Sequence, residues 1–101
     1  MLAIRNFKLK DGFVLHGIKS LDRYWLFNTE NGEHYELNST SYVVLEQLQG
    51  KKGFDDLLQE LKNSFEVDQE TAVADLKELL NYLLEEQIIQ KEPEEPKEGQ
   101  K

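Results

Sequence analysis

Hydrophobic and polar residues alternate over three short segments in the first third of the chain, and a period of two predicts β-strands. Residues 13–18 and 24–27 are rich in aromatic and branched side chains and are joined by a polar connection of hairpin length. The pair Asn31-Gly32 favours a tight turn and precedes the third segment, residues 33–37. These segments predict a three-stranded antiparallel sheet, and Phe7-Lys8-Leu9 adds an irregular strand before it.

The apolar period lengthens to about 3.6 after the third strand, which predicts helices in the rest of the chain. Asn38 or Ser39 caps a first helix over about residues 39–49. Gly53 precedes a second helix, and Asp68 caps a third. Strands followed by helices predict an α+β protein with a winged helix-turn-helix-like fold, in which the three-stranded antiparallel sheet is followed by a three-helix bundle.

The third strand runs into the first helix at residues 35–40 without a loop, which sets a sheet edge beside the helices. An edge strand carries unpaired N–H and C=O groups that accept a further strand from another chain. This arrangement predicts a docking groove for an extended peptide.

The third helix carries more apolar positions than one core contact requires. At 100° per residue the apolar stripe covers roughly 140° of the helix surface. Its members are Ala72, Val73, Leu76, Leu79, Leu80, Leu83 and Leu84. One interpretation places the flank with Val73, Lys77, Leu80 and Leu84 in a cleft beside the sheet. The opposite flank, with Asp75, Leu79 and Tyr82, is an equally open choice, and a third interpretation makes all seven apolar residues core.

The chain of 101 residues fits one domain with a single core. Its net charge is -8, and residues 53–90 hold two Lys/Arg against ten Asp/Glu. Nucleic-acid binders need a basic face to displace phosphate counterions, so the acidic helical half argues against nucleic acid as a partner. We predict a peptide-binding domain over residues 1–90 and a disordered charged tail over residues 91–101, where two prolines stand among Glu and Lys residues.

The sequence contains neither an apolar run long enough for a signal peptide or membrane span nor a cysteine. Without cysteine, disulfides and thiolate chemistry are excluded. These features predict a cytoplasmic protein with no membrane partner, as a monomer or weak dimer.

Catalytic residue patterns are weak in this chain. The two histidines, His16 and His34, fall on separate predicted strands without the paired spacing of a metal site. The hydroxyl cluster Ser39-Thr40-Ser41 stands at a helix start, where such groups bond the backbone. We therefore expect no enzyme activity, no metal and no cofactor.

Short motifs follow one another in a fixed order between residues 24 and 89. They are Tyr24-Trp25-Leu26-Phe27, Asn31 to Asn38, Thr40 with Val44-Leu45, Leu48 and Gly50, Phe65-Glu66-Val67-Asp68, Ala74-Asp75-Leu76 with Leu79-Leu80 and Leu83, and Ile88-Ile89. In this order they resemble the PqqD-like peptide chaperones, also called RiPP recognition elements, over about residues 12–89. Gln87 departs from the family pattern, which usually has Gly before the final apolar pair.

The resemblance implies non-catalytic binding of the leader peptide of a ribosomally synthesised and post-translationally modified peptide (RiPP) precursor. The leader adds as a strand to residues 33–37 and lies against the third helix. The peptide-binding residues are then Glu33, His34, Tyr35, Glu36 and Leu37 on the strand and Val73, Leu76, Lys77, Leu80 and Leu84 on the helix.

The resemblance also implies a second partner, a maturation enzyme that receives the precursor. This enzyme is either a lasso-type leader protease and cyclase or a radical S-adenosylmethionine enzyme. Tyr24-Trp25 and the Asn-Gly turn favour the lasso type. Two alternatives stay open: a winged-helix transcription factor that binds DNA, and a structural subunit of a maturation enzyme.

Overall fold

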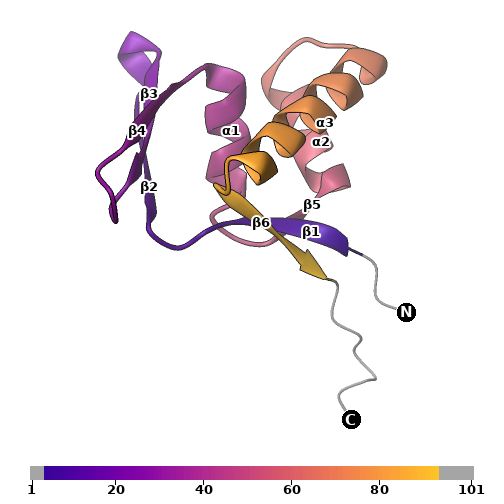
Figure 1. Cartoon of the computed structure of the whole chain (residues 1–101). Helices are drawn as coiled ribbons and strands as arrows, with labels where there is room; N and C mark the ends of the chain where they lie inside the picture. The colour runs from indigo at the N-terminus through magenta and orange to yellow at the C-terminus, as the bar shows by residue number, and fades with distance from the viewer. Residues whose placement is uncertain (1–3, 94–101) are drawn as a thin grey trace.

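Two small sheets and three α-helices make up the structure, a computed structural model that describes residues 4–93 (Figure 1). The strands are β1 (Ile4–Leu9), β2 (Phe13–Ile18), β3 (Arg23–Asn28), β4 (His34–Leu37), β5 (Lys52–Gly53) and β6 (Ile89–Pro93). The helices are α1 (Ser39–Gln47), α2 (Phe54–Ser64) and α3 (Gln69–Glu85), and a 3-10 turn, η1 (Lys19–Leu21), joins β2 to β3. The predicted α+β class, meander and helix order are confirmed.

Strands β2, β3 and β4 form the predicted antiparallel meander, in that spatial order. Their side chains alternate between two faces, and Leu26 is buried against the helices while Phe27 is exposed. Tyr24 stacks on Tyr42 of α1, with 4.4 Å between ring centroids. Figure 1 shows α1 standing between this meander and the pair of helices α2 and α3.

The second sheet joins segments from the start, middle and end of the described chain, in the order β5-β1-β6. Its strand β1 includes the predicted irregular strand, and the N–H of Leu9 donates to the carbonyl of Leu48 at 2.8 Å. Strand β6 pairs antiparallel with β1, with Lys91 opposite Phe7. The predicted domain boundary at residue 90 falls inside β6. Residues 91–93 are polar, but they form a strand because their main chain pairs with β1. Residues 94–101 of the predicted tail lie outside the described residues.

The core is a cluster of aliphatic side chains to which every helix contributes. Its fully buried members are Leu26, Val44, Leu45, Leu48, Leu57, Leu76, Leu83, Ile88 and Ile89. Among the described residues, no helix is long and apolar enough to cross a membrane.

The first and third helices begin at the capping residues that the sequence predicted. The Asn38 side chain accepts a hydrogen bond from the N–H of Ser41 at 2.8 Å, and Asp68 accepts one from Thr71 at 3.0 Å. At the end of α3, Gln87 takes a positive φ of 62°. The N–H groups of Gln87 and Ile88 then donate to the carbonyls of Leu84 and Leu83, which closes the helix with a Schellman motif. The chain turns sharply into β6 although no glycine is present.

Candidate functional site

Strand β4 is an edge of the meander and pairs with β3 alone among the described strands. The N–H of Asn28 donates to the carbonyl of Glu33 at 2.8 Å. This bond determines which residues of β4 are hydrogen-bonded to β3. Residues of an antiparallel strand bond alternately to one side and the other, so Tyr35 and Leu37 bond to β3. His34 and Glu36 consequently direct their N–H and C=O groups away from the sheet, and this edge offers four main-chain groups to a further strand.

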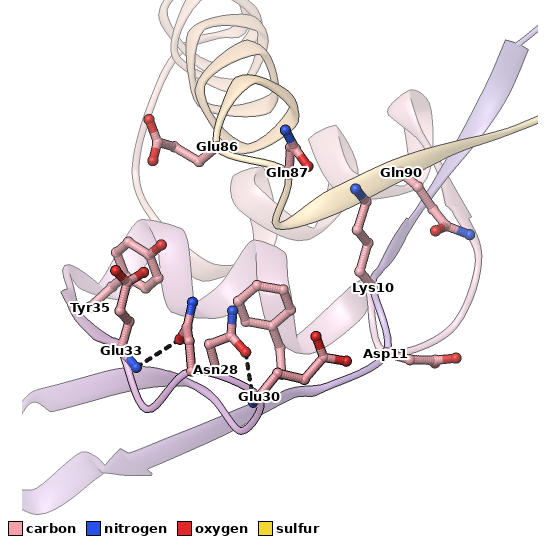
Figure 2. Close-up of a pocket in the computed structure, with 11 residues that line it drawn as sticks. Lys10, Asp11, Asn28, Glu30, Glu33, Tyr35, Glu86, Gln87 and Gln90 are labelled. Carbon is pink, nitrogen blue, oxygen red and sulfur yellow. Dashed lines mark hydrogen bonds between the residues drawn. The ribbon is translucent and has the colours of Figure 1, made fainter.

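A hollow of about 520 Å³ lies at the Glu33 end of β4. Figure 2 shows it between the loop before β4, on one side, and the end of α3 with Glu86 and Gln87, on the other. Its lining residues are Lys10, Asp11, Phe13, Asn28, Glu30, Asn31, Glu33, Tyr35, Glu86, Gln87 and Gln90. Two side-chain amides shape the loop, because Asn28 accepts from the N–H of Glu30 and Asn31 from that of Glu33, each at 2.9 Å.

A second hollow, of about 380 Å³, lies at the other end of β4, where the strand enters α1. Its walls are the start of α1 and one flank of α3. The lining residues are Asn38, Thr40, Ser41, Asp75, Glu78, Leu79 and Tyr82. Its walls combine an apolar surface with hydroxyl and carboxylate groups.

Tyr35 links the two hollows. Its half-buried side chain lines the first hollow, while Tyr82 lines the second. Burial raises the pKa of Tyr35, and the negative charges of Glu33 and Glu86 and the neighbouring Tyr82 raise it further. Tyr35 lines the same hollow as Glu86 and Gln87, so it lies opposite the end of α3. We call the β4 edge and the two hollows the leader groove, after the ligand that the sequence resemblance implies.

The predicted helix residues occupy other places. Leu76 is fully buried and Leu80 is 4% exposed, so both belong to the core. Lys77, Leu80 and Leu84 line a third hollow of about 350 Å³, whose other walls are Phe7, Phe54, Asn81 and Lys91. This hollow faces β1, α2 and β6, not β4.

The orientation of α3 about its own axis explains the difference. Its buried residues Ala72, Leu76 and Leu83 point at the centre of the core, so the two half-buried flanks of the stripe lie on opposite sides of them. Val73 and Leu84 fall on the flank toward β1, whereas Leu79 falls on the flank toward β4. The sequence left open which flank faces the sheet. The flank with Asp75, Leu79 and Tyr82 faces the start of α1, directly after β4.

Comparison with known protein families shows which family the chain belongs to. A family model described as "Coenzyme PQQ synthesis protein D (PqqD)" matches residues 23–89. The chain belongs to the PqqD family. No curated protein matches this PqqD-family chain by sequence.

Solved structures share the fold of this PqqD-family chain. TbiB1 in complex with the TbiA(beta) leader peptide superposes with a TM-score of 0.70 at 20% identity, over 82% of this chain and 94% of that one. A structure described as lasso peptide synthetase B1 complexed with the leader peptide gives a TM-score of 0.67 at 23% identity, over 83% of this chain and 96% of that one. The PqqD part of Methylobacterium extorquens PqqCD, described as a stand-alone RiPP recognition element, gives 0.67 at 19% identity, over 84% and 88%.

The histidines of the chain lie on the outer face of the meander. His16 stacks on Trp25 with 5.8 Å between ring centroids, and His34 lies 5.9 Å from Phe27. Within the described residues, no three His, Asp or Glu side chains gather closely enough to hold a metal ion.

Proposed function

We propose that this chain binds the leader peptide of a RiPP precursor in the leader groove, by adding the leader as an antiparallel strand to β4. The observation that carries the proposal is the β4 edge, which has no further strand among the described ones. There His34 and Glu36 direct four main-chain groups outward between two hollows. The solved relatives with this fold include two proteins in complex with leader peptides.

The strand side of the site follows the sequence prediction, with residues 33–37 as the docking strand. On the helix side, the flank of α3 beside β4 takes the place of the peptide-binding residues predicted from the sequence, which were Val73, Leu76, Lys77, Leu80 and Leu84. A guest residue opposite Tyr35 points to the same side of the sheet as Tyr35, so it meets Leu79 and Tyr82.

The energetics assign separate roles to the two walls of the groove. Four main-chain hydrogen bonds contribute about 0.5 to 1.5 kcal/mol each. Two buried apolar leader side chains add about 1.5 to 3 kcal/mol each. Association costs about 4 to 15 kcal/mol, so main-chain pairing alone gives neither tight nor selective binding. The α3 flank therefore selects the leader. At the favourable end of these ranges the net gain is about 8 kcal/mol, so we expect a dissociation constant no tighter than about micromolar.

Within this proposal the bound precursor is presented to a separate maturation enzyme in the cytoplasm. A lasso-type leader protease and cyclase is our first choice for that enzyme, because one of the two leader-bound structures with this fold is a lasso peptide synthetase B1. A radical S-adenosylmethionine enzyme is the alternative recipient. Pull-down of each enzyme with the chain, in the presence and absence of leader, separates the two.

A matched pair of substitutions at one position tests the strand addition. His34→Pro removes an outward N–H and leaves the β3–β4 hydrogen bonds in place, since proline is tolerated at a sheet edge. His34→Ala removes the side chain and keeps the N–H. Synthetic leaders from small open reading frames encoded beside this chain are titrated by fluorescence anisotropy. We expect His34→Pro to weaken binding at least tenfold and His34→Ala less than threefold, with both circular dichroism spectra unchanged. Equal affinities for the two variants, or no leader bound by the wild type, would overturn the proposal.

A further inference from the structure

Carboxylates dominate both ends of the leader groove. Asp11, Glu30, Glu33 and Glu86 line the first hollow, against Lys10 as its one basic residue. Asp75 and Glu78 line the second hollow without a basic residue among its described walls. Two acidic ends therefore flank a middle formed by Tyr35, Leu79 and Tyr82.

All six carboxylates belong to exposed residues, so their charges are open to a guest. Glu33 and Glu86 lie at the end of the hollow where Tyr35 lies, whereas Lys10 lies at the opposite end beside Gln90 (Figure 2). Both glutamates act on Tyr35. Burial is the largest cause that raises the pKa of Tyr35, and the negative charges of Glu33 and Glu86 raise it further.

Arg23, a basic residue of the neighbouring strand β3, is already engaged on the outer face of the meander. Arg23 pairs with Glu36 at 3.0 Å, and its guanidinium lies 5.2 Å from the centre of the Trp25 ring, on the outer face of the meander. The Arg23–Glu36 pair is the ion pair found among the described side chains. The six carboxylates of the groove therefore have no described basic side chain within 4.0 Å.

We infer that the leader segment taken up by this groove is basic, with Lys or Arg on both sides of an apolar residue at alternate positions. This inference rests on the proposed strand addition to β4. Guest residues opposite Leu37, Tyr35 and Glu33 all point toward α3, because side chains alternate across a sheet. The first of them meets Asp75 and Glu78, the second meets the aromatic middle, and the third meets Glu33 and Glu86.

The pattern is therefore basic, apolar, basic at positions i, i+2 and i+4 of the guest. Positions i+1 and i+3 face the outer side of the sheet, where His34 and Glu36 lie, and carry no such requirement. Because the groove is open to solvent, the charges act on selectivity and association rate, and salt screens them.

A displayed library of random 12-residue peptides, selected on the immobilised full chain, tests the inference. We expect selected peptides to be enriched at least threefold in Lys and Arg over the starting library, in the i and i+4 pattern. Selected peptides should bind at least tenfold more weakly at 0.5 M than at 0.05 M salt.

Charge-reversal variants give a second test of the inference. Glu33→Lys with Glu86→Lys should lower the affinity for selected peptides at least tenfold and remove the preference at one basic position. The control, Glu46→Lys with Glu66→Lys, makes the same change in net charge at exposed residues that line neither hollow. It should change the affinity less than threefold. If the reversed variant fails to fold, the salt dependence of the wild type decides.

The outcomes separate this inference from the proposed function. Peptides that lose binding to His34→Pro but show no basic enrichment and no salt dependence would overturn the basic-leader inference and leave strand addition intact. Selected peptides that all bind His34→Pro as tightly as the wild type would remove the proposed function and the inference together.

Discussion

Gln87 shows how one side chain limits the stability of the turn that closes α3. A residue with a Cβ atom in the left-handed conformation costs about 1 to 2 kcal/mol, and glycine avoids this cost while adding about 0.5 to 1 kcal/mol of chain entropy. Gln87→Gly should therefore raise the free energy of unfolding in urea by about 0.5 to 1 kcal/mol. The same change at Gln90, in β6, should lower it by a similar amount. A loss of stability at both positions would contradict the geometry of the turn.

Leu80 and Tyr82 are two residues apart on α3 but have different environments. Leu80 is 4% exposed and Tyr82 is 49% exposed. Leu80→Ala should lower the free energy of unfolding by about 2 to 5 kcal/mol, because it leaves a cavity in the core. Tyr82→Ala should change it by less than about 1 kcal/mol and weaken leader binding about tenfold. Denaturation and anisotropy titrations on both variants check this, and a leader affinity unaffected by Tyr82→Ala would place the groove elsewhere.

The start of α3 is capped by a carboxylate, Asp68, so we expect its stability to depend on pH. The hydrogen bond from Thr71 lowers the pKa of Asp68 below its ordinary value of 3.8. A lowered pKa adds stability above the unfolded value, and this stability is lost as pH falls through the folded value. Asp68→Asn keeps a capping oxygen without the charge. The stability of wild type relative to Asp68→Asn, measured by urea denaturation, should be constant above about pH 5 and shrink below 3.8. A difference that is constant down to pH 2 would show that the charge contributes nothing to the cap.

The elements of the meander and the helices were predictable because local signals and tertiary packing agree there. Asn31-Gly32 marks the turn before β4, and Gly32 does take a positive φ of 79°. Asn38 and Asp68 cap the helices that their positions predicted. Such signals depend on a few neighbouring residues, and the sequence displays them directly.

The groove-facing flank of α3 was not predictable in the same way. The periodicity of α3 gives a symmetrical apolar stripe with Val73 and Leu84 at one border and Leu79 at the other. Which border faces β4 depends on how α3 packs against α1, α2 and the last strand. No residue on α3 itself encodes that choice, although the partly polar border with Asp75 and Tyr82 suits a solvent-filled groove better than a core.

The second sheet is a feature of the whole chain that local patterns concealed. Strand β5 has two residues, and β6 has a polar sequence, IQKEP. Both are strands because β1 pairs with them from the far end of the described chain. Non-local pairing of this kind leaves little mark on composition or periodicity.

Deletion of β6 tests the contribution of this sheet to the fold. Ile88 and Ile89 are each 1% exposed, and the main-chain N–H of Lys10 donates to the carbonyl of Ile88 at 2.9 Å. A chain ending at residue 87 loses both isoleucines, each worth about 2 to 5 kcal/mol by comparison with truncation to alanine, and should not unfold cooperatively on heating. A chain ending at residue 93 keeps every described element and should match the full chain. Equal melting of the two truncations would show that β6 is dispensable.

Amide hydrogen exchange at β4 is the most direct test of the groove. In the free protein the amides of His34 and Glu36 should exchange fast, while those of Tyr35 and Leu37 should be protected by β3. Saturation with a bound leader should slow exchange at His34 and Glu36 at least tenfold and leave the neighbouring pair protected. Leader binding that leaves His34 and Glu36 exchanging at their free rates would contradict strand addition at this edge.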